Sequence, residues 1–211
     1  MKDPQNRYIT DFSQEQDSVL NWLEKQTHLR TNHGRMLCGP VVGKLLEMIS
    51  GMIAPDSILE LGAFTGYSSI CLARGLRDGG HLHSIEINDE LEDLILEAHA
   101  KAGLQDKITL HLGDAAQILK ELDTKFDLVF IDANKRDYCS YYEMVFDYVK
   151  PGGYILADNV LWDGKVYADP LPKDAQTQGI YKFNKLIKED PRVENVIIPL
   201  RDGLNLIRLK K

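Results

Sequence analysis

The sequence predicts an α/β fold built on a mostly parallel sheet, and two apolar runs lead to this expectation. Phe126–Ile131 is nearly unbroken in its apolar character, as expected of a strand covered on both faces, and it ends abruptly at Asp132. A second run at residues 154–157 ends in the same way at Asp158. Such runs alternate with segments of helical periodicity, which is typical of parallel strands joined by helices.

The remaining elements follow in order along the chain. Residues 1–34 are polar with a short apolar segment, and they predict a helical arm or lid ahead of a main domain at residues 35–211. A helix is expected over residues 35–52, with Gly39 and Pro40 at its entry and Gly51 at its exit. Further helices are expected after residues 66, 88 and 114. Two more are indicated by the apolar faces Tyr141, Met144, Val145 and Tyr148, and Phe183, Leu186 and Ile187, and a turn is expected at residues 151–153. Strands are expected at residues 57–62, 81–87, 108–112, 126–131, 154–157, 193–198 and 204–209.

Length and composition fit a single domain of the cytosol. The chain of 211 residues can bury a sizeable core, and its formal net charge of -7 opposes general binding to nucleic acid or anionic membranes. The first thirty residues are polar, so we expect no signal peptide. No apolar run is expected to approach 18 residues, so we expect no membrane span. Cys38, Cys71 and Cys139 are scattered without a CxxC pair, which indicates free thiols in a reducing cytoplasm.

The turn after the first expected strand is a candidate cofactor site. Gly62 and Gly66 allow the backbone to approach a ligand closely, but their G-x-x-x-G spacing differs from the G-x-G-x-x-G dinucleotide fingerprint. Glu60 would repel a pyrophosphate and attract a cationic ligand. Glu86, placed 20 residues after Gly66, is suited to accept hydrogen bonds from ribose hydroxyls. S-adenosylmethionine, a positively charged adenosine without phosphates, fits both acids.

Polar residues at the ends of two buried strands form a second candidate site. Asp132, Asn134 and Lys135 follow one strand, and Asp158 and Asn159 follow the next. Ligands bind beyond the carboxyl ends of strands in open parallel sheets, so two neighbouring tips could hold one hard cation. An acid after a strand can also cap a helix, but a second acid and amide on the next strand weigh against that alternative.

Five motifs carry a resemblance to a known family. They are Glu-Leu-Gly-Ala-Phe-Thr-Gly-Tyr-Ser from Glu60, Ser-Ile-Glu-Ile-Asn from Ser84, Phe-Ile-Asp-Ala-Asn-Lys from Phe130, Ala-Asp-Asn from Ala157 and Leu-Trp-Asp-Gly from Leu161. In this order and spacing they resemble the cation-dependent and S-adenosylmethionine-dependent O-methyltransferases that include catechol and caffeoyl-coenzyme A O-methyltransferases. The resemblance covers roughly residues 35–211, and it implies a Rossmann-like, seven-stranded, mostly parallel sheet with an antiparallel last strand and helices on both faces.

The resemblance also implies roles for individual residues. Candidate cofactor-binding residues are Cys38, Glu60, Gly62, Ala63, Tyr67, Ser68, Glu86, Ala115 and Asp132. The implied metal ligands are Asp132, Asp158 and Asn159, whose hard oxygen donors favour Mg²⁺, or Mn²⁺ or Ca²⁺, over zinc. The histidines form no evident ligand pair. Candidate substrate-binding residues are Met36, Lys135, Trp162 and Asp163, although Trp162 could equally serve packing alone. Lys135 and Asp132 are the candidate catalytic residues, because a lysine close to a dication loses its proton more easily and can act as a general base.

The predicted activity is methylation of a hydroxyl on a vicinal aromatic diol, such as a catechol, a caffeate derivative or a flavonoid. Small phenols are favoured over coenzyme A esters, because the negative charge and short arm offer no evident cradle for a nucleotide phosphate. Asn134 and Asn205 depart from relatives that carry acids there, which leaves the acceptor open. A nicotinamide-dependent oxidoreductase, a non-catalytic binding module and a methyltransferase of proteins or nucleic acids are the alternatives. The apolar part of the N-terminal helix and the family analogy predict a homodimer.

Overall fold

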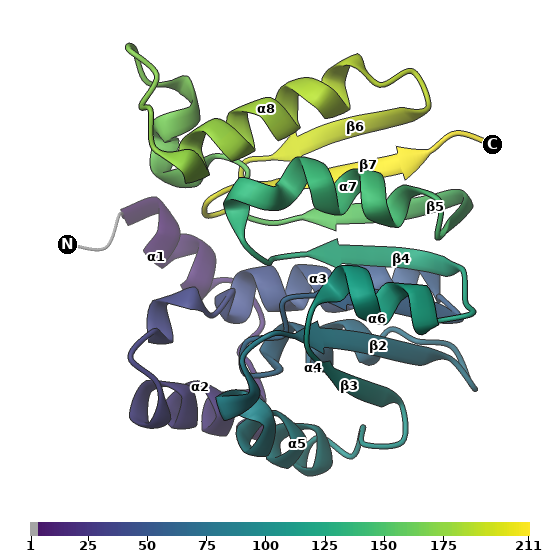
Figure 1. Cartoon of the computed structure of the whole chain (residues 1–211). Helices are drawn as coiled ribbons and strands as arrows, with labels where there is room; N and C mark the ends of the chain where they lie inside the picture. Colours follow the sequence, from purple (N-terminus) through teal and green to yellow (C-terminus); the bar gives the residue numbers. More distant parts are fainter. Residues whose placement is uncertain (1–3) are drawn as a thin grey trace.

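The computed structural model describes residues 4–211, without the side chain of Asn6. Its seven-stranded sheet has the order β3-β2-β1-β4-β5-β7-β6 (Figure 1). Strands β1 to β5 pair in parallel, and β7 is antiparallel to both β5 and β6. The predicted fold class, with an antiparallel last strand, is confirmed. The strands are β1 (Ser57–Leu61), β2 (His81–Glu86), β3 (Ile108–Leu112), β4 (Phe126–Ile131), β5 (Val149–Ala157), β6 (Val193–Ile198) and β7 (Leu204–Leu209).

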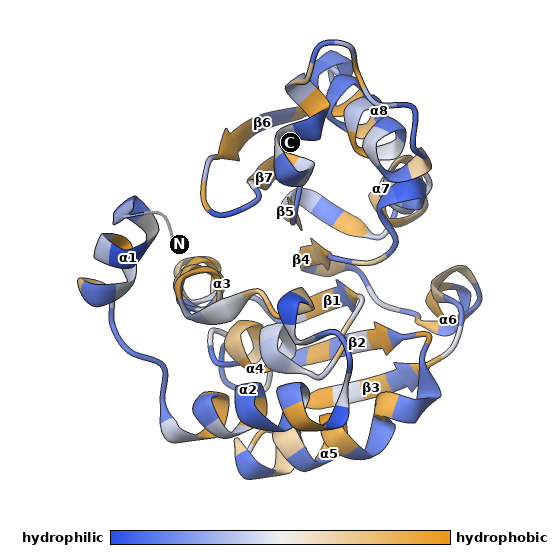
Figure 2. Cartoon of the chain, turned by 90° about the vertical axis from the view of Figure 1, so that its left-hand side faces the viewer, coloured by the Kyte–Doolittle hydropathy of each residue, from blue (hydrophilic) through white to orange (hydrophobic). Residues whose placement is uncertain are grey.

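Helices cover both faces of this sheet (Figure 2). The helices are α1 (Pro4–Asp11), α2 (Ser18–Arg30), α3 (Gly39–Ile53), α4 (Tyr67–Ala73), α5 (Glu92–Lys101), α6 (Ala115–Glu121), α7 (Tyr138–Phe146) and α8 (Ala175–Glu189). Short 3-10 helices are η1 (Gly34–Met36), η2 (Asp89–Leu91), η3 (Lys135–Asp137) and η4 (Trp162–Tyr167). Along β1, Ile58 belongs to the core under α2 to α5, whereas Leu59 belongs to the core under α6 to α8. This alternation explains why the central strands are apolar without interruption.

One expected boundary of α3 is corrected. The helix begins at Gly39, the expected entry, where Pro40 fixes the first turn and Gly39 has a φ of 75°. It passes through the expected exit at Gly51 and ends at Ile53, followed by Ala54, which adopts the left-handed conformation with a φ of 48°. The close approach in this region needs a glycine at Gly75, because a Cβ there would collide with the backbone nitrogen of Gly51.

Two later elements differ in detail from the expectations. Strand β5 starts at Val149, so the expected turn at residues 151–153 lies within the strand, where the pairing with β4 shifts register. Helix α7 buries Val145 as expected, together with Tyr138 and Tyr142. The other residues of the expected face, Tyr141, Met144 and Tyr148, are half-buried against the same core.

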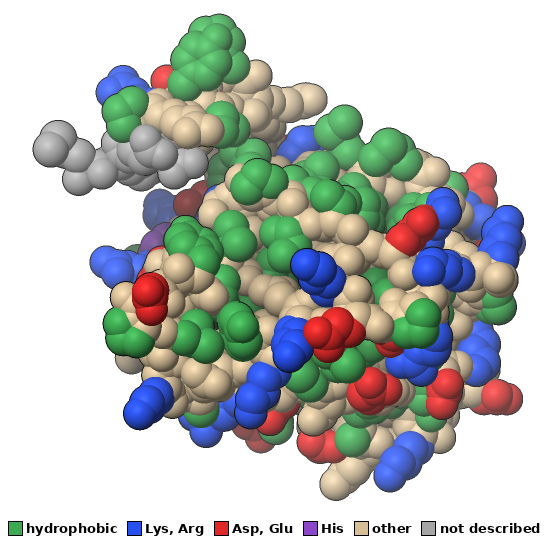
Figure 3. Space-filling model, turned by 90° about the horizontal axis from the view of Figure 1, so that it is seen from above, with side chains coloured by type: hydrophobic (Ala, Val, Ile, Leu, Met, Phe, Trp, Pro, Cys, Tyr) green, Lys and Arg blue, Asp and Glu red, His purple; other side chains and the backbone are tan. Residues whose placement is uncertain are grey.

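The N-terminal helices differ in how they join the body. Leu20 and Leu23 of α2 are buried in the core beside α4, and the Thr27 hydroxyl lies 2.9 Å from that of Thr65. Helix α1 projects from the body next to the N-terminus (Figure 3), with Tyr8 and Phe12 stacked at 4.3 Å between ring centroids. The division at residue 34 and the role as an arm or lid stay predictions.

The expectation that no apolar run approaches 18 residues is wrong for one stretch of the chain. Gly34–Ile53 is long and apolar enough to cross a membrane by length and composition alone. In the fold, Val42, Leu46 and Ile49 of this stretch pack into the core. With 39% of the stretch buried, the core accounts for part of its apolar composition.

Candidate active site

The tips of β4 and β5 bring the two predicted acids to one edge of the sheet. Ile131 is aligned with Ala157, so Asp132 and Asp158 follow adjacent strand ends. The Asp158 amide donates to the Ile131 carbonyl at 3.0 Å, which continues the pairing to the tips. Asn159 adopts a φ of 58°, which is uncommon for a residue other than glycine and is often found at functional sites.

Charge and burial make this edge suited to a cation. Burial raises the pKa of the Asp158 carboxyl, and the nearby Asp132 carboxylate raises it further. Lys135 Nζ donates to Asp132 Oδ1 at 2.5 Å, while Asp158 Oδ1 accepts the Asn159 amide at 2.8 Å. Among residues 4–211, no hydrogen bond engages Asp132 Oδ2, Asp158 Oδ2 or the Asn159 side chain. These oxygens therefore remain available as hard ligands, and their chemistry fits a divalent cation of the Mg²⁺ type.

A buried tyrosine that the sequence did not single out joins the two tips. The Tyr138 hydroxyl lies 2.9 Å from the Asp158 carbonyl oxygen and 3.2 Å from that of Ile131, and its single proton is shared between them. Tyr138 is fully buried at the start of α7. In the sequence, only its position three residues after Lys135 could have indicated a role for Tyr138 at the site. A tyrosine on the apolar face of a helix explains that position equally well.

The glycine turn after β1 packs directly on the β4 tip. Gly62 has a φ of 94°, and a Cβ at this position would lie 2.8 Å from the Asp132 carbonyl oxygen. A residue with a side chain would push the turn away from the tip. The predicted cofactor turn and the predicted cation site therefore share one wall.

Glu60 lies beneath this turn in a cage of serine hydroxyls. It is fully buried and accepts hydrogen bonds from Ser68 and Ser84, each at 2.5 Å, and from Ser69. Burial raises the pKa of the Glu60 carboxyl to about 7, although these hydroxyls favour its charged form. Ser69 and Ser84 are additions to the predicted site, and the carboxylate holds the turn on β2 through Ser84.

Glu86, at the end of β2, also braces the turn. Its Oε2 accepts the Phe64 amide at 2.7 Å, and its Oε1 accepts the amides of Ile87 and Asn88, both at 3.0 Å. Oε1 thus already accepts two hydrogen bonds, whereas Oε2 accepts one and can accept a further hydrogen bond from a ribose hydroxyl. Ala63 of the same turn is buried against Leu91 and Ile95, whose helical segments follow Glu86.

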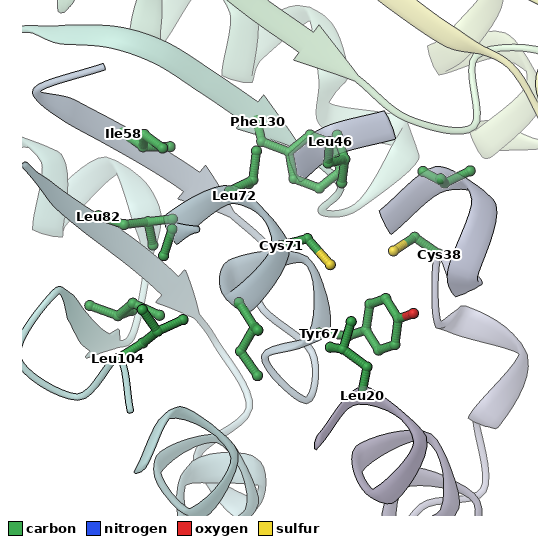
Figure 4. Close-up of a cluster of buried hydrophobic side chains, with 14 of the residues drawn as sticks. Leu20, Cys38, Leu46, Ile58, Tyr67, Cys71, Leu72, Leu82, Leu104 and Phe130 are labelled. Atoms are coloured by element: carbon green, nitrogen blue, oxygen red, sulfur yellow. The ribbon is translucent and has the colours of Figure 1, made fainter. Parts of the chain in front are cut away.

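The other predicted cofactor residues point in several directions. The Tyr67 hydroxyl donates to Gln16 Oε1 at 2.6 Å, so it contacts the segment between α1 and α2. The Cys38 thiol faces Cys71 in the core (Figure 4), and burial raises its pKa well above the usual range. Ala115 is the first residue of α6, whose amides are capped by the preceding Asp114. The contributions of these side chains to cofactor binding stay predictions.

The predicted substrate side consists of a strained loop and an exposed methionine. Trp162 and Asp163 have φ values of 47° and 54°, and the Asp163 amide donates to Asp202 Oδ1 at 2.6 Å. Trp162 packs against the core under α6 to α8, which supports its packing role, and its buried Nε1 has no partner within the described part of the chain. Met36, in η1, is 57% exposed. A substrate contact by any of these three stays a prediction.

The expectation that the histidines form no metal-ligand pair stays a prediction, although two of them contact each other through a hydrogen bond. His83 Nδ1 lies 3.0 Å from His111 Nε2 across β2 and β3, and His81 stacks edge-on against His83. No group of three or more His, Cys, Asp or Glu residues suited to a metal occurs in the described residues. That statement leaves the candidate cation site untouched, because its third ligand is the amide of Asn159.

A sheet with a glycine turn over β1 and a lysine and two acids at neighbouring tips defines an S-adenosylmethionine-dependent methyltransferase, and the comparisons with known proteins agree. The chain belongs to the O-methyltransferase family, whose model matches residues 10–210. Caffeoyl-CoA O-methyltransferase 1 of Eucalyptus globulus is 38% identical over 176 residues, covering 79% of this chain and 72% of the relative. Caffeoyl-CoA O-methyltransferase 2 of Petunia hybrida is 37% identical over 177 residues, covering 79% and 73%.

Solved structures show the same fold and cofactor. The O-methyltransferase of Bacillus cereus in complex with SAH has a TM-score of 0.89 at 29% identity, covering 98% of this chain and 97% of the other. TomG of Streptomyces achromogenes, involved in tomaymycin synthesis and solved with SAM, has a TM-score of 0.88 at 29% identity, covering 98% and 96%. The protein is an S-adenosylmethionine-dependent O-methyltransferase, and the oxidoreductase and non-catalytic alternatives are set aside.

Proposed function

We propose that this enzyme methylates one hydroxyl of a vicinal aromatic diol in a reaction that depends on a divalent cation, Mg²⁺ in the first place and Mn²⁺ or Ca²⁺ as substitutes. The observation that supports this proposal is the convergence of Asp132, Asp158 and Lys135 beside the glycine turn. Two acids in a buried setting repel each other unless a cation lies between or beside them. A diol presents the paired oxygens that such a site can receive.

The residues at the tips of β4 and β5 would have different roles in the reaction. Asp132, Asp158 and the Asn159 amide oxygen would hold the cation, which would raise the acidity of a neighbouring phenolic hydroxyl. Lys135 in its neutral form would take the proton of the hydroxyl that becomes methylated. The phenolate oxygen would then attack the sulfonium methyl carbon in line, forming the new O–CH₃ bond as the C–S bond breaks and S-adenosylhomocysteine leaves.

The acceptor belongs to the catechol, caffeate and flavonoid series. We favour small phenols, because the chain carries a net charge of -7 that opposes a highly phosphorylated ester. Caffeoyl-coenzyme A is the second candidate, because the plant relatives are named for it. The two differ in one requirement, since only the ester needs cations at the mouth of the site to receive its phosphates.

The decisive experiment compares methylation of catechol, caffeate and caffeoyl-coenzyme A with Mg²⁺ and with excess EDTA. We expect turnover of the free diols with Mg²⁺ and its loss on chelation. Asp132→Asn should lose Mg²⁺-dependent turnover, whereas Asp137→Asn, which changes an acid bonded to Asn134 in the same η3 turn, should retain it. Undiminished turnover in EDTA would remove the cation from the mechanism, and turnover of the ester alone would replace the favoured acceptor.

We also propose a homodimer in the cytoplasm that requires no nucleic acid or membrane. Support for the dimer comes from α1, where Tyr8 and Phe12 are 63% and 76% exposed, and from α3, where Met48 and Met52 are 57% and 75% exposed. Apolar groups of this size favour a protein contact. Sedimentation of the full chain is expected to show a dimer, and a monomer at all concentrations would refute it.

A further inference from the structure

Arg201 occupies an unusual position in the turn between β6 and β7. Its φ is 50°, a conformation that residues other than glycine, asparagine and aspartate seldom adopt. The turn is closed by a hydrogen bond of 2.9 Å from the Gly203 amide to the Leu200 carbonyl. Glycine would fit residue 201 without strain. The contacts of the Arg201 side chain account for an arginine at this position.

The guanidinium reaches a segment 163 or more residues earlier in the chain. Arg201 Nη1 donates to the Leu37 carbonyl at 2.9 Å and also to the Cys38 carbonyl. These two carbonyls belong to the link between η1 and α3. Gly39 follows with a φ of 75°, and a Cβ on it would lie 3.0 Å from the same nitrogen. The absence of a side chain at residue 39 therefore leaves room for the guanidinium.

The other side of the same turn holds the loop that follows the predicted metal ligands. The Leu161 amide donates to the Asp202 carbonyl at 2.8 Å, and the Val160 amide donates to the Gly203 carbonyl at 3.1 Å. The Asp163 amide donates to the Asp202 carboxylate. The turn between β6 and β7 thus contacts the loop 158–163 through its backbone. The same turn contacts the start of α3 through the Arg201 side chain.

We propose that Arg201 is a positioning residue that fixes the segment 36–39 relative to the loop 158–163, and so sets the wall of the cofactor and acceptor site. The inference rests on the proposed function, because it gives meaning to Met36 and Cys38 as parts of that wall. Arg201 acts through the Leu37 and Cys38 carbonyls and touches no reacting atom. Charge-assisted hydrogen bonds of this kind contribute more than neutral ones, and a single terminal nitrogen of the guanidinium, Nη1, serves both carbonyls.

The test uses Arg201→Gly in the full-length protein. Glycine removes the guanidinium with its two hydrogen bonds and at the same time suits the positive φ, so the two effects on stability oppose each other and the thermal midpoint should change little. We expect the Kd for S-adenosylhomocysteine, measured by calorimetry, and the KM for S-adenosylmethionine to rise about tenfold, because the segment 36–39 is no longer held by Arg201. The kcat should change less. Arg201→Lys, which keeps the charge without the fork, should recover part of the affinity.

Amide hydrogen exchange supplies a readout that does not depend on activity. Amides of residues 36–43 should exchange faster in Arg201→Gly than in the wild type. Arg208→Ala is the matched control, because Arg208 lies on β7 and pairs with Glu194 on the surface of the same hairpin. Unchanged exchange and unchanged Kd in Arg201→Gly, or equal changes in Arg208→Ala, would overturn the inference. A wild-type protein that turns over no vicinal diol with Mg²⁺ would instead refute the proposed function, and the exchange experiment would still decide on Arg201.

Discussion

Lys135 Nζ and Asp132 Oδ1 lie 2.5 Å apart, and only 10% and 17% of the two side chains are exposed. The 3-10 turn η3 turns the lysine back toward the strand tip that precedes it by three residues. A proposed base is thus paired with a proposed cation ligand, so the position of one depends on the other. This pairing gives Lys135 a defined place before any acceptor binds.

Replacing Lys135 should affect turnover more than binding. Lys135→Met keeps much of the buried stem and removes the amine, and we expect kcat to fall by about 10² to 10⁴ with little change in KM. Steady-state kinetics with a catechol at saturating Mg²⁺ measures this. Arg136→Met changes the exposed neighbour and should leave kcat intact. A variant of Lys135 with wild-type kcat would exclude it as the base.

Gly62→Ala should lower both stability and cofactor binding. The new Cβ would meet the Asp132 carbonyl oxygen at 2.8 Å and would also carry the cost of a positive φ. Gly79→Ala is the control, because Gly79 has a φ of 78° and nothing lies near its Cβ position. Urea unfolding should show a loss of about 1 kcal/mol for the control and about 1 to 3 kcal/mol more for Gly62→Ala. Equal losses would show that the contact with the tip is unimportant.

The sequence predicted most of the sheet because the signals of its strands are local. Buried strands are continuous apolar runs, and their ends at Asp132 and Asp158 are visible as abrupt changes of polarity. Element boundaries were less well predicted where glycine or proline lies inside an element. Gly51 looks like a helix stop but lies within α3, and Pro151 looks like a turn but lies in β5.

The contacts that complete the site could not be predicted, because they join residues far apart in the chain. Ser84 donates to Glu60 across neighbouring strands, and Arg201 reaches Leu37 over most of the sequence. Neither contact produces a periodic pattern or a short motif. A single serine or arginine has many possible partners, and only the packing of the sheet and helices selects one.

Stability should fall below pH 6.5 in part because of His99. This side chain is 1% exposed, its Nε2 has no partner in the part of the chain that the structure describes, and burial lowers its pKa to about 4. The folded protein therefore resists a proton that the unfolded chain accepts near pH 6.5. The contribution of neutral His99 is complete above that pH and declines toward pH 4, with a loss of about 2 kcal/mol at pH 5.

His99→Leu isolates this effect from other titrating groups. Glu60 works in the opposite direction, because its pKa of about 7 lets the folded state bind a proton first, but it is present in both proteins. Urea unfolding at pH 7.5 and pH 5 should show a smaller loss of stability for the variant. The same loss in both proteins would mean that His99 is protonated without cost, through water or a local opening.

Tyr138→Phe should weaken the cation site from beneath. The hydroxyl serves the carbonyls of Ile131 and Asp158, and its removal leaves the Asp158 carbonyl without this donor, while the Ile131 carbonyl keeps the Asp158 amide, at a cost of about 1 to 2 kcal/mol. Tyr142→Phe is the matched control one turn later on α7, where the hydroxyl donates to Asp190 at 2.9 Å, away from the tips. Both variants should lose stability in urea. Only Tyr138→Phe should raise the Mg²⁺ concentration for half-maximal turnover, by several fold, because it alone loosens the strand ends that carry the proposed ligands. An equal shift in both variants would assign the effect to general loosening of α7, and no shift in either would show that the tips keep their spacing without the tyrosine.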